Sequence, residues 1–140
     1  MATGTNGRIA LMSIHPQYAR AILDGTKEVE FRKRPLAPDT THVVIYSTKP
    51  DGAIIGAFKI TFQKTLPKTQ LWENFREVGR IEETPFFDYF KNHDEGVAIG
   101  VGDTYRLRES IALTELGITT APQSYQYLPD GAATRIFGRI

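Results

Sequence analysis

The residue types best suited to chemistry gather in one segment near the N-terminus. Five basic and three acidic residues fall between Arg20 and Arg34. Lys27, Glu30 and Arg32 follow a glycine that is expected to end a helix, and Glu30 and Arg32 share one face of the strand expected next. We therefore expect the three side chains to converge in a cleft between helix and strand, although a solvent-exposed strand face with weak ion pairs would show the same pattern.

Two kinds of chemistry are open to these three residues. Lysine and arginine can hold a phosphate, while a carboxylate can accept a hydrogen bond from the exocyclic amine of a nucleobase. The same residues could instead transfer protons, because burial beside Arg32 would lower the pKa of Lys27 and desolvation would raise that of Glu30. The residues alone leave binding and catalysis open.

Two further segments carry side chains that suit a nucleotide. Tyr46, Ser47 and Lys49 bring two hydroxyls and one cation to the end of a strongly apolar strand. Ser124 and Tyr125 lie in an expected extended segment, where the aromatic ring could stack on a base. An ordinary transition from strand to turn explains the first group equally well, and core packing explains the second.

The composition argues against several other classes of function. Seventeen Lys and Arg against 16 Asp and Glu leave a formal net charge of +1, so a nucleic-acid site would have to come from local clustering. The chain has no cysteine, and its three histidines lack the spacing of a metal site, so we expect neither metal nor cofactor. No apolar run is long enough to span a membrane and no signal-peptide pattern is present, so we expect a cytoplasmic protein.

A helix and a strand are expected to position the charged segment. After a short buried strand at residues 8–13, the pattern predicts a helix over 14–25, with Pro16 in its first turn and Gly25 at its end. From residue 27 to 34 apolar and charged residues alternate, which predicts a half-buried strand with one charged face.

The rest of the chain predicts more strands than helices. Turn residues at 50–52 indicate a hairpin, with a bulge or bend at Gly56. Aromatic residues within 68–91 predict two short core helices. The remaining expected strands and extended segments are 43–46, 53–62, 96–101, 105–113 and 122–128. The expected fold class is α+β, with about six mostly antiparallel strands in a small sheet or barrel and two or three short helices.

The expected domain organisation is simple. Residues 1–7 are small and polar and predict a flexible tail, while 8–140 predict a single domain. Residues 129–140 are expected to add a strand or to pack over an edge of the sheet.

The segment 13–32, SIHPQYARAILDGTKEVEFR, resembles the opening signature of ASCH domains, members of the PUA-like superfamily, in which a G-x-K-x-x-E-x-R pattern follows the first helix. Two further blocks, within 44–58 and 113–128, follow in the order expected for that family. The resemblance covers residues 9 to about 128. It implies a small PUA-like β-barrel with a cleft beside the first helix, lined by Lys27, Glu30 and Arg32, and a role with RNA or nucleotides.

The resemblance also bears on catalysis. Some ASCH-like proteins are hydrolases, including amidohydrolases that act on acylated cytidine with a lysine and a threonine in this motif, and others resemble ribonucleases. Lys27 matches the amidohydrolase lysine, but Glu30 stands where those enzymes carry the threonine. This departure argues against amidohydrolase activity.

The sequence thus predicts an ASCH-type domain that binds RNA or a nucleotide in a cleft formed by Lys27, Glu30, Arg32, Tyr46, Ser47, Lys49, Ser124 and Tyr125. One alternative is an enzyme, either a metal-independent ribonuclease or a small nucleoside amidohydrolase, with Lys27 as base or electrostatic stabiliser and Glu30 as proton shuttle. Tyr46, Lys49 and Ser124 are further acid–base candidates for a ribonuclease. A third possibility is a protein-interaction module that uses the aromatic residues of 72–90, for which dimerisation, rather than the expected monomer, would be the sign.

Overall fold

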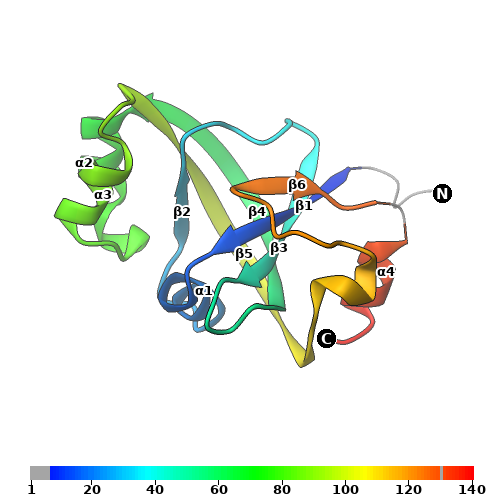
Figure 1. Cartoon of the computed structure of the whole chain (residues 1–140). Coiled ribbons are helices and arrows are strands. Elements are labelled where there is room, and N and C mark those ends of the chain that lie inside the picture. Colours follow the sequence, from blue (N-terminus) through cyan, green and yellow to red (C-terminus); the bar gives the residue numbers. More distant parts are fainter. Residues whose placement is uncertain (1–6, 130) are drawn as a thin grey trace.

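The computed structural model describes residues 7–129 and 131–140, and its strands form one mixed sheet with helices packed against it (Figure 1). The predicted tail, residues 1–7, lies outside the described residues apart from Gly7. The strand order is β2-β5-β4-β3-β1-β6. In chain order the elements are β1 (Arg8–Ile14), α1 (Pro16–Leu23), β2 (Val29–Arg32), β3 (Thr40–Ser47), β4 (Ala53–Pro67), α2 (Lys68–Gly79), α3 (Glu83–Tyr89), β5 (Glu95–Ile111), a 3₁₀ helix (Leu113–Leu116), β6 (Tyr125–Tyr127) and α4 (Ala132–Phe137).

The sheet confirms the predicted fold class and adds one detail to it. Neighbouring strands are antiparallel except β1 and β3, which are parallel. The sheet resembles a barrel that is not closed, because β2 and β6 stand at its two ends without pairing with each other. The predicted hairpin is β3–β4, and the ladder shifts register beside Gly56, where a bulge or bend was expected. The opening between the two end strands is where the candidate site lies.

Residues 96–101 and 105–113 were expected as two strands, but 96–101 and 105–111 belong to the single long strand β5, and the 3₁₀ helix begins at Leu113. The sequence Gly102-Asp103 between them looks like a turn, but the glycine serves close packing instead. A Cβ at Gly102 would approach the Thr61 side chain of β4 to 2.8 Å. Register shifts between β4 and β5 bend the two strands without interrupting either.

Helix α1 forms as predicted and is fixed by local chemistry. Pro16 occupies its first turn, and Gly25, just beyond its end, has a φ of 84° that residues with a Cβ rarely adopt. Ala19 and Ile22 are fully buried in the main core, against β1, β3 and β4. The helix therefore holds the start of the charged segment against one end of the sheet.

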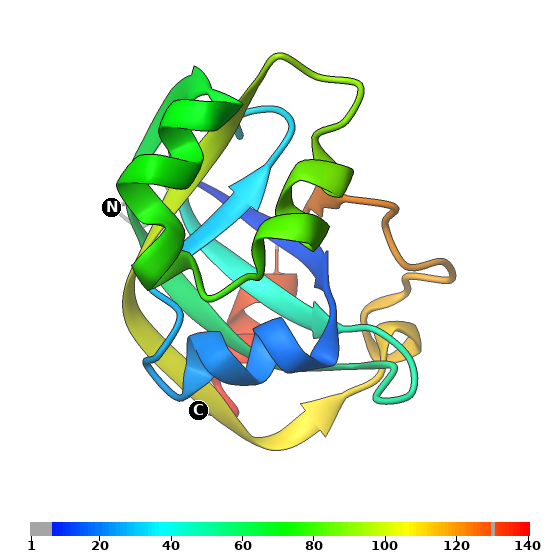
Figure 2. The ribbon, with the colours of Figure 1, turned by 90° about the vertical axis from the view of Figure 1, so that its left-hand side faces the viewer.

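Helices α2 and α3 confirm the two short core helices predicted within residues 68–91. They pack against β2 and the first half of β5. Figure 2 shows this pair (green) on the same side of the sheet as α1 (blue). Phe86 and Phe90 are fully buried with Leu71, Val29 and Ala98. Burying one such phenylalanine contributes about 1.5–3 kcal/mol. The predicted core role of this aromatic group is thus confirmed for its central rings.

The C-terminal residues form a helix, α4, where the sequence analysis expected a strand or a segment packed over an edge. Ala132 and Ile136, one helical turn apart, are both buried. Ile136 packs in a second core that contains Leu11, Val44 and Ile54. The alternation of arginine with apolar residues had suggested a strand. The burial at a spacing of four residues is what identifies the helix.

The end of α2 approaches β2 so closely that only glycine fits there. A Cβ at Gly79 would lie 2.4 Å from the ring of Phe31. We expect Gly79→Ala to lower the free energy of unfolding by about 1–3 kcal/mol, because the ring must leave its packed position. Urea unfolding measures this difference.

Glu77→Ala, an exposed change on the same helix, is the matched control and should alter stability by less than about 0.5 kcal/mol. A second background, Phe31→Leu, identifies the cause: it should remove most of the penalty of Gly79→Ala. Equal penalties in both backgrounds would mean that the clash with Phe31 is not responsible.

Candidate functional site

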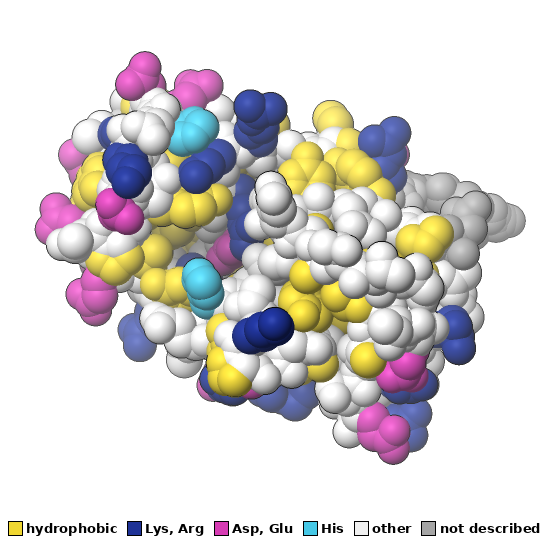
Figure 3. Space-filling view, viewed as in Figure 1, with side chains coloured by type: hydrophobic (Ala, Val, Ile, Leu, Met, Phe, Trp, Pro, Cys, Tyr) yellow, Lys and Arg dark blue, Asp and Glu magenta, His cyan; other side chains and the backbone are white. Residues whose placement is uncertain are grey.

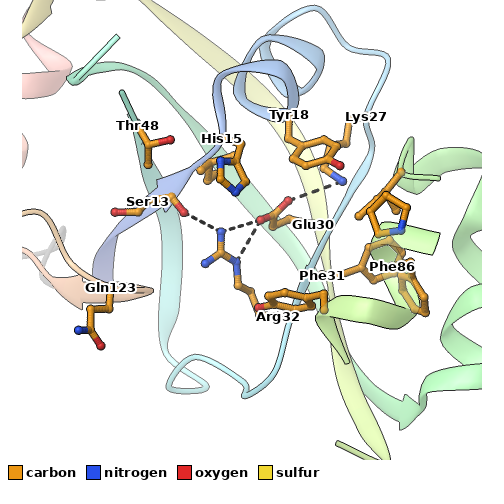
Figure 4. Close-up of a pocket in the computed structure, with 14 residues that line it drawn as sticks. Ser13, His15, Tyr18, Lys27, Glu30, Phe31, Arg32, Thr48, Phe86 and Gln123 are labelled. Atoms are coloured by element: carbon orange, nitrogen blue, oxygen red, sulfur yellow. Dashed lines mark hydrogen bonds and ion pairs between the residues drawn. The ribbon is translucent and has the colours of Figure 1, made fainter. Parts of the chain in front are cut away.

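A cavity of about 370 Å³ opens between α1, β2 and α3, on the open side of the sheet (Figure 4). Figure 3 shows it as a hollow between the helical lobe formed by α2 and α3 and the rest of the sheet, with basic and acidic side chains in its depth. It lies within the size range of small-molecule sites. Its walls are formed by Ser13, Ile14, His15, Tyr18, Lys27, Glu30, Phe31, Arg32, Thr48, Ile81, Pro85, Phe86, Tyr89 and Gln123.

Strand β2 turns its charged residues into this cavity and not toward solvent. Glu30 and Arg32 are only 6% and 9% exposed, and Val29 and Phe31 on the opposite face are also buried. A solvated strand face would leave both charges in water, so that explanation of the alternating pattern is wrong. Glu30 and Arg32 therefore form a polar part of the cavity wall, while Val29 packs in the apolar core and Phe31 both packs there and borders the cavity.

Arg32 connects three parts of the structure across the gap in the sheet. Its Nε and Nη2 donate to Glu30 Oε2 at 3.0 and 2.7 Å. Nη2 also donates to the backbone carbonyl of Ser13 at 2.8 Å (Figure 4). Nη1 donates to Ser124 Oγ at 3.2 Å. Arg32 thereby ties β2, at one end of the sheet, to β1 and to the segment before β6, at the other.

Lys27 is almost completely enclosed, with 2% of its surface exposed. Its amine donates to the backbone carbonyl of Gly79 at the end of α2 and lies 3.6 Å from Glu30 Oε1. The rings of Tyr18 and Phe31 lie on either side, with centroids 5.1 and 5.5 Å from the amine. Burial lowers the pKa of Lys27, the Glu30 carboxylate opposes this shift, and the charge of Arg32 reinforces it.

The charges of this cluster do not balance. Lys27 and Arg32 share a single carboxylate, and among the described residues that line the cavity Glu30 is the one acidic side chain. When Lys27 is protonated, the cluster carries one excess positive charge in a place with little access to water. Because an unpaired buried charge is costly, an anion bound in the cavity would be stabilised there.

Aromatic side chains line the cavity beside the charges. Tyr18, Phe86 and Tyr89 line it. Burial, with help from the carboxylates of Glu30 and Glu82, raises the pKa of the Tyr18 hydroxyl. Burial also raises the pKa of the Tyr89 hydroxyl, against the opposing charge of Arg32. Both phenols therefore keep their protons at neutral pH and can donate hydrogen bonds, while their rings offer flat apolar surface.

Of the eight predicted site residues, Lys27, Glu30 and Arg32 line the cavity, and Ser124 joins them through its hydrogen bond from Arg32 without lining the cavity itself. The other four are not part of this cluster. Tyr46 is 8% exposed and packs in the second core, and Lys49 lies exposed in the turn after β3. Ser47 donates to Asp51 Oδ2 at 2.7 Å, and Tyr125 packs at the edge of the main core.

Several residues of the cavity wall were not predicted as site residues. In the sequence, His15 suits a helix cap and Tyr18 a buried helical stripe, and Ser13 and Gln123 carry no signal of a site. Thr48 lies between the predicted Ser47 and Lys49. A helical spacing of three is the one signal that could have placed His15 and Tyr18 on a common face. The other three come from β1, the end of β3 and the segment before β6, which only the folded sheet brings together.

Within residues 7–129 and 131–140, no group of three or more His, Asp or Glu side chains could hold a metal ion. In the same part of the chain, no helix is long and apolar enough to cross a membrane. What the cavity does offer is an anion site beside hydrogen-bond donors, one carboxylate and stacking surface.

Comparison with known proteins connects this geometry to a family. The family model of the ASCH domain matches residues 12–110. An ASCH domain-containing ribonuclease from Zymomonas mobilis is 30% identical over 100 residues, which cover 71% of this chain and 68% of that protein.

Solved structures agree with this match. The crystal structure of ASCH from Zymomonas mobilis superimposes with a TM-score of 0.85 at 27% identity, covering 93% of this chain and 94% of that chain. A mutant of that protein, with a serine replaced by alanine, gives a TM-score of 0.86 at 27% identity and covers 95% and 96%. The matches over most of the chain, in sequence and in fold, show that the chain belongs to the ASCH family.

Proposed function

We propose that this protein binds RNA by holding one nucleotide in the cavity between α1, β2 and α3. Its family and its ribonuclease-named relative support an RNA-related function. The observation that carries the finer proposal is the excess positive charge of Lys27, Glu30 and Arg32 beside an aromatic wall. A nucleotide combines the two matching features, an anionic phosphate and a flat base.

Each cavity residue has a role in this proposal. Arg32 neutralises the phosphate, aided by the charge of Lys27. The Lys27 amine is itself too enclosed to move toward the ligand. Glu30 accepts a hydrogen bond from an exocyclic amine of the base. Tyr18 and Tyr89 provide the stacking surface in the cavity. Tyr46, one of the predicted site residues, does not contribute because it lies in the second core.

A second candidate function is a metal-independent ribonuclease, favoured by the name of the relative from Zymomonas mobilis. In this case Lys27 acts as a base or electrostatic stabiliser, Glu30 moves a proton, and Ser124 stands at the edge of the cavity. The nucleoside amidohydrolase alternative has less support, because Glu30 stands at the position of the nucleophilic threonine and is already paired with two cations.

Arg32 gives the most direct test of the binding proposal. We expect Arg32→Gln to weaken binding of a single-stranded RNA by about 10- to 100-fold, the usual loss when a charge-assisted hydrogen bond is removed. Fluorescence anisotropy with labelled RNA measures the dissociation constant. Arg32→Lys should recover only part of the affinity, because lysine lacks the planar fork.

Arg106→Gln is the matched control, since Arg106 is an exposed arginine outside the cavity that pairs with Asp24. It should leave affinity nearly unchanged. If Arg32→Gln and Arg106→Gln weaken RNA binding equally, the cavity is not the binding site.

The lowered pKa of Lys27 predicts how binding depends on pH. Burial lowers this pKa below the 10.5 of a free lysine, so Lys27 loses its proton earlier as the pH rises. Deprotonation removes the excess positive charge of the cluster. We therefore expect RNA affinity to fall as pH rises toward 10.5, in titrations of a phosphodiester ligand whose own charge stays constant.

Lys27→Met serves as the reference protein because it keeps a long apolar side chain without the charge. It should bind more weakly at neutral pH and lack the alkaline decrease. An alkaline decrease of the same size in Lys27→Met would assign the effect to another group, such as a tyrosine.

The ribonuclease alternative is tested by product formation in the presence of EDTA. The wild-type protein is incubated with single-stranded RNA, duplex RNA and N4-acetylcytidine, and products are followed by gel and chromatography. A ribonuclease should cleave RNA with chelator present, and Lys27→Met should abolish the product. If Lys27 acts as the base, the rate should rise with pH through its lowered pKa, because only the neutral amine accepts a proton.

Binding without any product would mean that the cavity binds RNA without cleaving it. Product that persists in Lys27→Met would remove Lys27 from the reaction. Release of cytidine from N4-acetylcytidine would favour the amidohydrolase.

A further inference from the structure

A second aromatic and basic surface begins at the edge of the cavity. Strand β6 follows directly after Gln123, which lines the cavity, and Ser124, which accepts a hydrogen bond from Arg32. Tyr125 and Tyr127 alternate along this strand and share one face. Their ring centroids lie 5.6 Å apart with planes at 71°, and both side chains remain partly exposed. The strand thus carries two rings outward from the cavity.

Basic side chains accompany these rings. The Arg8 guanidinium lies 5.3 Å above the ring centroid of Tyr127, and it stays 55% exposed although it pairs with Asp39 at 3.5 Å. Arg34 is exposed just beyond β2, and its charge acts on Tyr125: burial and Tyr127 raise the pKa of the Tyr125 hydroxyl, and Arg34 lowers it. Figure 3 shows hydrophobic side chains beside the hollow, around β6, with basic side chains on either side of them.

The surface is also held in shape before any ligand binds. Tyr127 Oη accepts a hydrogen bond from the backbone amide of Ala37 at 2.8 Å. The backbone of β6 pairs with β1 from Ala10 to Met12. A rigid aromatic surface loses little conformational entropy on binding, which favours affinity.

We propose that this β6 surface, formed by Arg8, Arg34, Tyr125 and Tyr127, binds the part of a single-stranded RNA that continues from the nucleotide held in the cavity. The inference rests on the proposed function of that cavity. Alternating rings and cations suit single-stranded nucleic acid, because bases stack on the rings while cations follow the phosphates. Such contacts do not depend on base identity, so the β6 surface adds affinity and leaves base selection to the cavity.

Ligand length separates the two sites in an experiment. Binding of a nucleoside monophosphate reports on the cavity alone, whereas a single-stranded hexanucleotide also reaches the β6 surface. We expect Tyr125→Leu to weaken hexanucleotide binding by about 5- to 150-fold, the cost of one lost base stack, and to leave monophosphate binding unchanged. Arg34→Gln and Arg8→Gln should each reduce the slope of log affinity against log salt by about 0.7 for the hexanucleotide.

Arg106→Gln is again the matched control, here for Arg8. Both arginines are similarly exposed, at 59% and 55%, and each pairs with one aspartate. The control should alter neither affinity nor salt slope. Thermal unfolding of every variant checks that the fold is kept.

The outcomes separate this inference from the proposed function. Loss of hexanucleotide affinity in the β6 variants, with monophosphate binding kept, supports it. If the β6 variants bind the hexanucleotide like the wild type while Arg32→Gln weakens both ligands, the cavity proposal stands and the proposal that the β6 surface binds RNA is wrong. If the β6 variants weaken hexanucleotide binding and Arg32→Gln has no effect, RNA binds the β6 surface without entering the cavity. A protein that binds neither ligand contradicts both.

Discussion

The structure depends on one buried carboxylate that is shared by two buried cations. Glu30 accepts two hydrogen bonds from Arg32, and its Oε1 lies 3.6 Å from the Lys27 amine. Burying any one of these charges alone would cost several kcal/mol, so each is tolerated only because the others are present. The register of β2 against β5 sets the arrangement, since a slip of one residue would turn Glu30 and Arg32 away from the cavity and toward the core.

The same cluster also joins elements that the backbone leaves apart. Arg32 reaches the Ser13 carbonyl and the Ser124 hydroxyl across the gap between the two end strands. Lys27 reaches the Gly79 carbonyl at the end of α2. A ligand that interacts with these charges therefore acts at once on β1, on the segment before β6 and on the helical lobe. The unclosed side of the sheet is held together by side chains, and this leaves room for a cavity there.

The sequence was sufficient to predict the local elements of this site but not their surroundings. Alternation and a glycine predicted the strand after α1 and the convergence of Lys27, Glu30 and Arg32. Whether the charged face met water or a cavity depended on contacts such as that from Arg32 to Ser124, 92 residues away, which no local pattern encodes. Tyr46 illustrates the reverse case, because a strand end predicts a place near the edge of the sheet, whereas pairing with β4 turns its ring into the second core.

The burial of Lys27 also bears on whether it could act as a catalytic base. A general base must reach its substrate and exchange protons with water. Lys27 is 2% exposed, donates to a carbonyl and faces a carboxylate, so its amine is committed to partners that favour a fixed cation. The groups at the mouth of the cavity, His15 and the hydroxyl of Ser124, are exposed to solvent and are free of this constraint. Of the two roles open to Lys27 in a ribonuclease, the geometry therefore favours the electrostatic stabiliser over the base, with the buried cluster supplying the charge that holds a phosphate in place.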